Sequence, residues 1–306
     1  MPFLKWIGGK VNLLSTLDEL FPNMTSIDGY VEAFLGGGSV FFYIKENYGA
    51  SLENKPIYLS DVNSELINAY KVVRDDVEDL IPLLQKHEDN HDEEYYYKIR
   101  GIYPPGNKLN SVEKAACFIY LNRTCFNGLW RVNSEGKNNV AIGYYKRKVP
   151  IYDKRELLKC SSMLKDARLN VMSYENIIRI KNIKNYFIYL DPPYLQVDDR
   201  NNNFTGYSSD AFHLSRKVML PKIFKELDKL GCKVMLSNSH APVIKKEYKD
   251  FNILIVDTKR SANTFGGVTS IDRKSQWDEK RESIGEVVIT NYTPNKKQKT
   301  IENSWF

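Results

Sequence analysis

The sequence predicts an α/β protein in which a long helical segment interrupts a mostly parallel β-sheet. Short apolar runs alternate with helical patterns over residues 1–61 and again over residues 150–306, whereas helical periodicity dominates between them. One apolar run, residues 186–190, is followed by two prolines, which cannot donate to a sheet ladder and therefore end the strand. We expect residues 1–61 and 150–306 to form one domain and residues 62–149 an inserted, mainly helical domain.

The tetrapeptide Asp191-Pro192-Pro193-Tyr194 follows that strand, at the edge of an α/β sheet where ligands bind. The Asp191 carboxylate and the Pro192 carbonyl both accept hydrogen bonds, and together they suit an exocyclic amino group with its two N–H donors. Tyr194 offers a flat face on which a base could stack. The alternative is a strand-ending turn in which Asp191 caps a helix and Tyr194 belongs to the core.

The composition is that of an ordinary globular protein. The chain has 306 residues, 42% of them hydrophobic and 27% charged, which allows one large core or two domains. It shows no apolar run of membrane-spanning length and no basic-then-apolar leader, so we expect a cytoplasmic protein that is not secreted. The net charge of +6 is compatible with a polyanionic partner.

Cysteine and histidine spacing does not predict a metal site. The cysteines form no C-x-x-C pair, and we expect reduced, partly buried thiols at Cys117, Cys125, Cys160 and Cys232. His87 and His91 lie four residues apart in an acidic stretch, which favours a solvated polar face over metal ligation.

Residues 3–10 contain two adjacent glycines, which let a backbone approach a ligand closely, together with Lys5, Trp6 and Lys10. The stretch is not a nucleoside-triphosphate loop, because Val11 stands where Ser or Thr must follow the lysine. The alternative is a plain N-terminal turn with Trp6 in the core and solvated lysines.

A predicted strand at residues 29–34 enters the glycine turn 35–39, and a helix follows over residues 40–47. Such a turn forms the first crossover of a nucleotide-binding sheet. Phe41 occupies the place of the last glycine in the dinucleotide fingerprint, so a cofactor without pyrophosphate, packed against the turn, fits better. An ordinary strand-to-helix turn is the alternative.

A second short strand, residues 56–60, ends at Asp61. An acid about 20 residues after a glycine turn is well placed for a ribose diol. Asp61 could equally cap the next helix.

The inserted segment combines helices with a polar loop. Helical patterns cover residues 65–73, 77–87, 93–100 and 112–122. In residues 123–148, aromatic, amide and cationic side chains alternate; arginine can read guanine, asparagine can read adenine, and a ring can wedge into a base step. We expect a DNA-facing edge here, against the alternative of a basic, solvated hairpin with Trp130 in a local core.

The sheet pattern then returns. We expect helices over residues 155–164, 214–230 and 241–248, and strands over residues 169–172, 233–237, 253–257 and 286–292. Residues 196–212 are predicted to form a mobile flap, residues 259–283 a long polar loop and the tail after Pro294 a loose end.

The motifs follow one order: Lys-Trp-x-Gly-Gly-Lys, the glycine turn, the acid at a strand end, Asn-Gly-Leu-x-Arg-x-Asn and Asp-Pro-Pro-Tyr. Over residues 3–292 this order resembles the Dam-type DNA adenine-N6 methyltransferases, the D12 class of the alpha-group amino-methyltransferases. The resemblance implies a Rossmann-like methyltransferase sheet with an inserted target-recognition domain. It also implies S-adenosylmethionine as the methyl donor, without a metal.

The resemblance assigns site residues motif by motif. Contacts to the donor fall on Trp6, Lys10, Phe34, Gly36, Gly38, Asp61, Ser173, Tyr174 and Asp191. The catalytic tetrapeptide comprises Asp191, Pro192, Pro193 and Tyr194. Contacts to DNA fall on Lys5, Phe126, Asn127, Leu129, Arg131 and Tyr145. Ala33 and Ala141 stand where the family usually has proline, and Ala141 lies beside the base-reading loop that is expected to select GATC.

The expected chemistry is a direct methyl transfer. An adenine inside a duplex cannot reach a buried sulfonium, so it must be flipped out. Tyr194 would stack on the base, while Asp191 and the Pro192 carbonyl accept from N6 and direct its lone pair at the methyl group. In-line displacement needs no enzyme nucleophile.

Two other functions remain open. One is methylation of RNA or of a protein glutamine, and the other is a non-catalytic DNA-binding relic of a methyltransferase. Double-stranded DNA is the expected partner, and a cognate restriction endonuclease of the same system is a further candidate.

Overall fold

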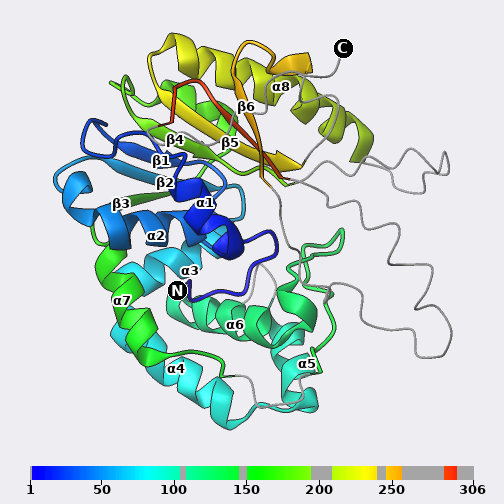
Figure 1. Cartoon of the computed structure of the whole chain (residues 1–306). Helices are drawn as coiled ribbons and strands as arrows, with labels where there is room; N and C mark the ends of the chain where they lie inside the picture. The colour runs from blue at the N-terminus through cyan, green and yellow to red at the C-terminus, as the bar shows by residue number, and fades with distance from the viewer. Residues whose placement is uncertain are drawn as a thin grey trace, which may run out of the picture. The chain divides into compact units, whose positions relative to one another are not determined.

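The computed structural model describes residues 2–103, 108–144, 150–193, 209–239, 246–256 and 286–294, without the side chains of 209–218 and 239 (Figure 1). The chain packs as two compact units. Unit 1 comprises Met1–Leu14 and Tyr30–Tyr174, and unit 2 comprises Ser15–Gly29 and Glu175–Phe306. These two units are defined by how compactly the chain packs and not by function. The predicted boundaries between a catalytic and a target-recognition domain, at 61/62 and 149/150, therefore stay a prediction.

Unit 1 contains three strands of a parallel sheet in the order β3-β2-β1. Their bounds are β1 Tyr30–Glu32, β2 Ile57–Asp61 and β3 Ala167–Val171. β2 lies between the other two, and Ile57 pairs with both Tyr30 and Ala167. The sheet is therefore built from strands on both sides of the helical segment, as the interrupted pattern predicted.

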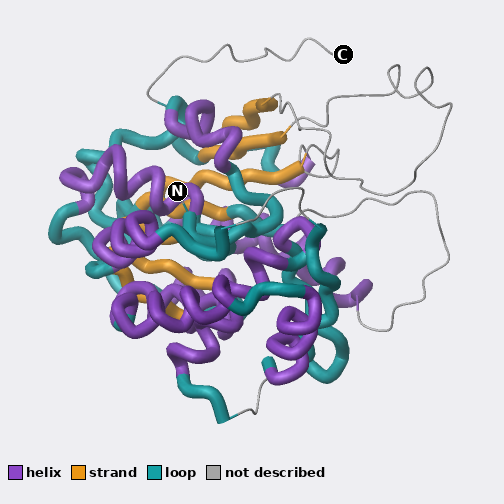
Figure 2. Tube along the Cα trace, turned by 90° about the horizontal axis from the view of Figure 1, so that it is seen from below, coloured by secondary structure: helices purple, strands orange, loops and turns teal. Residues whose placement is uncertain are grey.

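The described part of unit 1 also contains helices, which Figure 2 colours purple. They are α2 Ser39–Tyr48, α3 Ser64–Asp75, α4 Val77–Asp89, α5 Glu93–Ile102, α6 Ser111–Thr124 and α7 Lys154–Leu164, with 3-10 turns at Val11–Leu13, Gly49–Leu52 and Phe126–Gly128. α6 begins with a capping box of Asn110 and Glu113 and is buried from Ala115 to Asn122, against α3, α4 and α5. An almost wholly buried α6 explains why its apolar residues surround the helix instead of forming one stripe.

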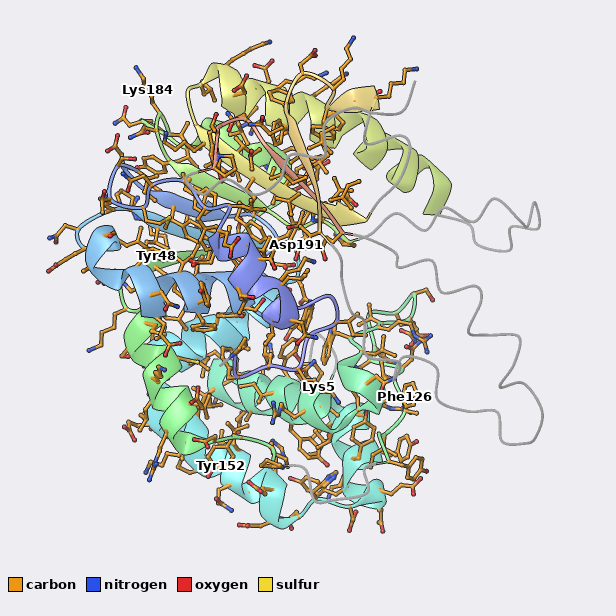
Figure 3. All side chains as sticks on the ribbon, in the orientation of Figure 1. Lys5, Tyr48, Phe126, Tyr152, Lys184 and Asp191 are labelled. Carbon is orange, nitrogen blue, oxygen red and sulfur yellow. The ribbon has the colours of Figure 1, made fainter. Side chains whose placement is uncertain are left out.

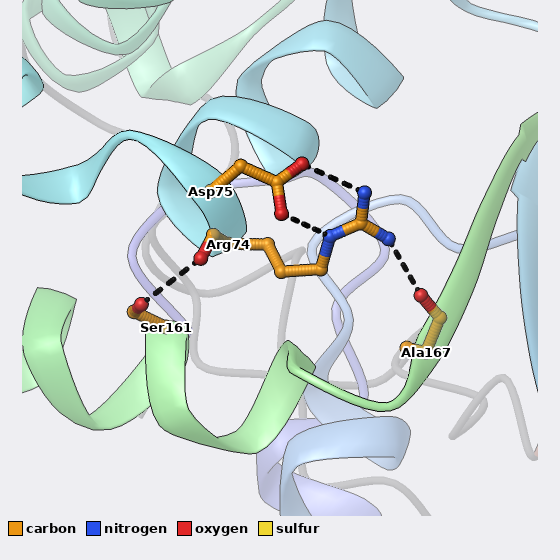
Figure 4. A network of polar contacts seen from close by, with 4 residues as sticks. All are labelled: Arg74, Asp75, Ser161 and Ala167. Carbon is orange, nitrogen blue, oxygen red and sulfur yellow. Dashed lines mark hydrogen bonds and ion pairs between the residues drawn. The ribbon is translucent and has the colours of Figure 1, made fainter.

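One polar network joins the end of α3 to the elements that return to the sheet (Figure 4). The Arg74 guanidinium donates from Nε and Nη2 to the Asp75 carboxylate, at 2.7 Å each, and from Nη1 to the carbonyl of Ala167 at 2.7 Å. Ser161 of α7 donates to the carbonyl of Arg74 at 3.3 Å. This arginine therefore ties the helical segment to α7 and to the first residue of β3.

Unit 2 contains the other four described strands, in the order β4-β5-β7-β6. Their bounds are β4 Phe187–Leu190, β5 Lys233–Ser239, β6 Asn252–Val256 and β7 Glu286–Thr290. β4 and β5 are parallel, whereas β7 is antiparallel to both β5 and β6. The helices are α1 Leu14–Asp18, whose first residue belongs to unit 1, and α8 Ser209–Lys229, with a 3-10 turn over Tyr174–Arg179.

The predicted α/β class with a mostly parallel sheet and a helical insertion is confirmed, and most predicted elements are present. Several boundaries were wrong by one or more residues: β1 ends at Glu32 instead of residue 34, α6 continues through Arg123 and Thr124, and α8 begins at Ser209, inside the predicted flap. The rest of that flap, the 259–283 loop, the tail and most of the 241–248 helix lie outside the described residues. No helix in the described ranges is long and apolar enough to cross a membrane.

Candidate functional site

The glycine turn and Asp61 form the centre of the site in unit 1. Gly36 and Gly38 have φ angles of +47° and +67°, which suit glycine far better than other residues. The Asp61 carboxylate accepts from the backbone N–H of Gly36 at 3.1 Å through Oδ2 and from that of Asn63 at 3.0 Å through Oδ1. Asp61 is half-buried, so the turn and the end of β2 share one carboxylate that also faces solvent.

Asp61 does not cap α3. That role belongs to Asn63, whose side chain accepts from the N–H groups of Glu65 and Leu66 at 3.0 and 3.1 Å. The helix-cap alternative for Asp61 was therefore wrong. The Asp61 carboxylate instead joins the end of β2 to the glycine turn through its hydrogen bond with Gly36.

Trp6 packs directly on the glycine turn. A Cβ atom at Gly36 would lie 2.9 Å from Cδ1 of the Trp6 ring, and one at Gly37 would lie 2.9 Å from the Trp6 Cβ. The Trp6 side chain thus requires glycine at both positions. Trp6 itself is half-buried.

Lys10 anchors the same N-terminal stretch. It is 3% exposed, its N–H donates to Oγ of Ser39 at 3.1 Å, and its Nζ donates to the carbonyl of Gly8 at 3.1 Å. The alternative of solvated lysines was therefore wrong for Lys10, although Lys5 is exposed.

Phe34 and Tyr174 lie face to face, with ring centroids 5.1 Å apart and ring planes inclined by 28°. Phe34 follows β1 and Tyr174 follows β3, so they reach the same edge of the sheet as Asp61. Tyr174 is buried and the neighbouring Ser173 is half-buried. Unit 1 thus brings together all the predicted donor contacts except Asp191.

Asp191 belongs to unit 2, where it follows β4 directly (Figure 3). All four residues of β4 are buried; Asp191 is half-buried, Pro192 is buried and Pro193 is exposed. The strand ends where the prolines begin, as predicted. Tyr194 lies outside the described residues.

The predicted base-reading loop begins at the carboxyl end of α6. Phe126 and Leu129 are 41% and 36% exposed, which is high for large apolar side chains. The N–H of Phe126 donates to the carbonyl of Ala141 at 2.9 Å, so the two limbs of the loop are joined at its base. Asn127 has a φ angle of +53°, a left-handed conformation that asparagine tolerates. Tyr145 lies outside the described residues.

Arg131 lies on the exposed limb of a short hairpin in that loop. Val132 and Asn138 form an antiparallel bridge, and the N–H of Asn133 donates to the carbonyl of Lys137 at 2.9 Å. Nε of Arg131 donates to Oδ1 of Asn139 at 2.8 Å. The backbone therefore forms a hairpin, as the alternative interpretation of this loop expected. The side-chain amide of Asn139 orients the Arg131 guanidinium.

The sequence reasoning missed Asn122 and Asn139, which contact predicted site residues. One feature of the sequence points to Asn122: it ends the run 115–122, in which the only other side chain with an oxygen is that of Tyr120. Asn139 offered none, because four asparagines occur between residues 127 and 139.

The histidine prediction was wrong for His87. His87 is 7% exposed, its ring stacks on Tyr120 with centroids 4.8 Å apart, and its Nδ1 lies 2.9 Å from the Tyr95 hydroxyl. Burial lowers its pKa to about 4. His91 lies near the same ring, with Nδ1 2.9 Å from the Tyr120 hydroxyl. Within the described ranges, no group of three or more His, Cys, Asp or Glu side chains could hold a metal ion.

All four cysteines are free and buried, in agreement with the prediction of reduced thiols. Burial raises the pKa of Cys117, Cys160 and Cys232 to about 12 and that of Cys125 to about 11. These thiols are therefore protonated and unreactive at neutral pH.

Comparisons with known proteins agree with the motif order. Residues 6–262 match the profile of the D12 class N6 adenine-specific DNA methyltransferases. Type II methyltransferase M.MjaIII of Methanocaldococcus jannaschii is 37% identical over 95% of this chain and 99% of its own. Type II methyltransferase M1.LlaDCHI of Lactococcus lactis subsp. cremoris is 36% identical over 95% of each chain. A DNA adenine methylase of Salmonella typhi is 29% identical over 87% of this chain and 90% of its own.

Proposed function

Because the chain belongs to the D12 class of N6 adenine-specific DNA methyltransferases, we propose that it methylates N6 of an adenine flipped out of duplex DNA, within the sequence GATC. The family membership establishes an adenine-specific DNA methyltransferase. The flipped base, the donor, the residue roles and the target sequence are the proposal. One observation supports it most strongly. The chain has two hydrogen-bond acceptors, Asp191 and the Pro192 carbonyl, directly after β4, and a loop with exposed apolar side chains after α6.

The donor is S-adenosylmethionine, which supplies an electrophilic methyl group on a sulfonium. The described residues fit such a molecule. Asp61 is a half-buried acid at the end of β2, a position suited to a ribose diol, and half-buried Trp6 packs on the glycine turn. The other contacts are Lys10, Phe34, Gly36, Gly38, Ser173, Tyr174 and Asp191. The turn lacks the last glycine of a pyrophosphate site, as befits a donor without one.

Asp191 and Pro192 supply the chemistry. The carboxylate and the proline carbonyl accept the two N–H groups of the adenine amino group, which favours a pyramidal nitrogen and aims its lone pair at the methyl group. Half-burial of Asp191 at the end of a wholly buried strand supports this, since a fixed acceptor stabilises the transition state without reorganising. Pro193 shapes the turn, and Tyr194 stacks on the flipped base.

Target recognition belongs to residues 62–149. Exposed Phe126 and Leu129 are suited to wedge between base pairs, because they are large apolar side chains on a polar loop and gain by leaving water. Base edges are read by Lys5, Asn127, Arg131 and Tyr145. The Arg131 side chain is exposed and already oriented by Asn139, as direct readout requires.

The GATC target is supported by the way Ala141 contacts the loop. Its backbone carbonyl accepts from the N–H of Phe126, and a proline would offer the same carbonyl. The replacement of the family's usual proline therefore keeps the hydrogen bond that closes the loop. The relatives named Type II methyltransferases favour a role beside a restriction endonuclease that cuts the same sequence.

The deciding experiment is to express the protein in cells that lack adenine methylation and to map N6-methyladenine in a plasmid of random sequence. We expect modification at GATC in most copies. In parallel, transfer of labelled methyl groups to duplex DNA, RNA and total protein separates the alternatives. Preferential labelling of RNA or protein contradicts the proposal, and failure to bind S-adenosylmethionine would indicate a relic.

A further inference from the structure

Asn122 is a buried amide at the carboxyl end of α6, with 0% of its surface exposed. Its Oδ1 accepts from the N–H of Lys5 at 2.9 Å, and its Nδ2 donates to the carbonyl of the same lysine at 2.9 Å. Nδ2 also donates to the carbonyl of Gly128 at 3.3 Å. The amide orientation follows from its partners, because one N–H and two carbonyls can be satisfied in no other way.

Lys5 and Gly128 are in direct contact as a result. A Cβ atom at Gly128 would overlap the carbonyl oxygen of Lys5 and lie 2.8 Å from its Cγ. Gly128 also has a φ angle of +67°. Glycine is therefore required at this position both by the backbone conformation and by the close approach of the N-terminal stretch. Figure 3 labels Lys5 and Phe126 on the two segments that Asn122 joins.

The same face of α6 holds these two segments one turn earlier. Phe118 lies four residues before Asn122, and residues four apart share a helix face. Its ring centroid lies 6.2 Å from that of Trp6 and 4.2 Å from that of Trp130. Phe118 thus contacts the residue after Lys5 and a residue of the loop through apolar packing, whereas Asn122 contacts both segments through hydrogen bonds of defined direction.

We propose that Asn122 is a positioning residue that fixes the backbone of Lys5 against Gly128, and so holds Lys5 and the 126–131 loop in the one arrangement that reads the target sequence. This inference rests on the proposed DNA-binding role of Lys5 and the loop. Asn122 is fully buried, so it acts on specificity through Lys5 and Gly128. Loss of its side chain frees three backbone groups, and the two base-reading segments are then held together by the apolar contacts of Phe118 without hydrogen bonds of defined direction.

The test compares kcat/KM on a GATC duplex with kcat/KM on duplexes that carry each single-base change. We expect Asn122→Ala to reduce the ratio between them by roughly tenfold, the scale of one misplaced base contact. Gly128→Ala disturbs the same contact from the loop side and should reduce the ratio similarly. The double variant should show no further loss, because the two changes break one contact.

Matched controls in unit 2 separate positioning from general destabilisation. Asn291 makes the same number of hydrogen bonds as Asn122: Oδ1 accepts from the N–H of Val234, and Nδ2 donates to Asp228 and to the carbonyl of Cys232. Gly231 has a φ angle of +78°, so Gly231→Ala imposes similar backbone strain. Asn291→Ala and Gly231→Ala should lower Tm but leave the discrimination ratio unchanged.

The outcomes are distinguishable. Suppose that the wild type prefers GATC to its single-base variants. If folded Asn122→Ala and Gly128→Ala show the same preference, this inference is overturned and the proposed function is not. If Asn122→Ala does not fold, Gly128→Ala decides in the same way. A wild type that methylates no duplex overturns the proposed function and this inference with it.

Discussion

Arg131 and Asn139 hold each other across the hairpin of the base-reading loop. Nε of Arg131 donates to Oδ1 of Asn139 at 2.8 Å, and the N–H of Asn139 donates to the carbonyl of Arg131 at 3.1 Å. With Nε occupied by Asn139, the Nη1 and Nη2 donors are the ones presented to a ligand. Two such donors match the O6 and N7 acceptors of guanine in the major groove.

Replacement of Arg131 by alanine should therefore relax the choice at one guanine of the target. We expect a loss of about 1–3 kcal/mol of discrimination at that position. Asn139→Ala should act in the same direction with a smaller loss, because the guanidinium remains but is no longer oriented. Methylation rates on GATC and its single-base variants measure both. Equal losses on every substrate, with a weaker salt dependence, would assign Arg131 to the DNA backbone.

Asp61→Ala should weaken binding of S-adenosylmethionine by about 1–3 kcal/mol, the scale of a lost charge-assisted hydrogen bond. Isothermal titration calorimetry measures this directly. Asn63→Ala is the matched control, because it removes the cap of α3 two residues away and should lower stability without the same loss of donor affinity. Unchanged donor affinity in a folded Asp61→Ala protein would contradict the assignment.

Asp191→Ala should abolish methyl transfer and leave duplex affinity nearly unchanged, because phosphate contacts supply most of the binding free energy. Asp191→Asn keeps the size but turns one acceptor into a donor, so it should reduce kcat by roughly 100-fold or more. Single-turnover kinetics and fluorescence anisotropy separate the two effects. Substantial turnover by either variant would remove Asp191 from the chemistry.

Tyr194→Ala should lose stacking on the flipped base, worth about 1–3 kcal/mol. A duplex with 2-aminopurine in place of the target adenine reports on this, since its fluorescence rises when the base leaves the stack. We expect a strong rise with the wild type and a weaker one with Tyr194→Ala. The same rise with both proteins would mean that another group holds the base.

Buried His87 should make the protein less stable in acid. Burial, with a smaller contribution from repulsion by Lys86, lowers the pKa of His87 from 6.5 to about 4. Between these values the unfolded chain binds a proton that the folded chain does not, so the stabilisation is complete above about pH 6.5 and is lost as the pH falls toward 4. We expect a loss of about 2–3 kcal/mol in the free energy of unfolding between pH 7 and pH 4.

Urea denaturation at several pH values tests this expectation. His87→Phe keeps an aromatic ring beside Tyr120 and cannot titrate, so it should lack this part of the pH dependence, whatever its absolute stability. If the free energy of unfolding depends on pH equally in the wild type and in His87→Phe, His87 either stays neutral in both states or is solvated in the fold.

The sequence predicted those features that arise from local pattern. Short apolar runs located all the described strands, and the glycine turn after β1 and the acid at the end of β2 lie where the sequence placed them, because each depends on a few consecutive residues. Contacts between distant residues could not be predicted in the same way. Asn122 lies 117 positions from Lys5, and nothing local shows that a helix end closes on the N-terminal stretch.

The burial of side chains also depends on contacts between distant residues and could not be predicted from local sequence. His87 lies among charged residues in the sequence, so a solvated face was the natural expectation, yet the ring faces Tyr120 from another helix. Asp61 shows the reverse case: its position was predicted correctly, but one of its two alternatives could be rejected only after Asn63 was seen to cap the helix. Local signals identify residues, and tertiary packing decides between their roles.

The position of β7 has a consequence for synthesis on the ribosome. β7 is the last of the described strands in sequence, yet it lies between β5 and β6 and pairs with both. Until Glu286–Thr290 emerges, β6 has no neighbour in the described sheet and β5 exposes one edge. A nascent chain at this stage therefore carries open strand edges, which favour aggregation. Unit 2 can complete its described sheet only after Glu286–Thr290 has been synthesised, so premature termination before β7 should yield insoluble protein.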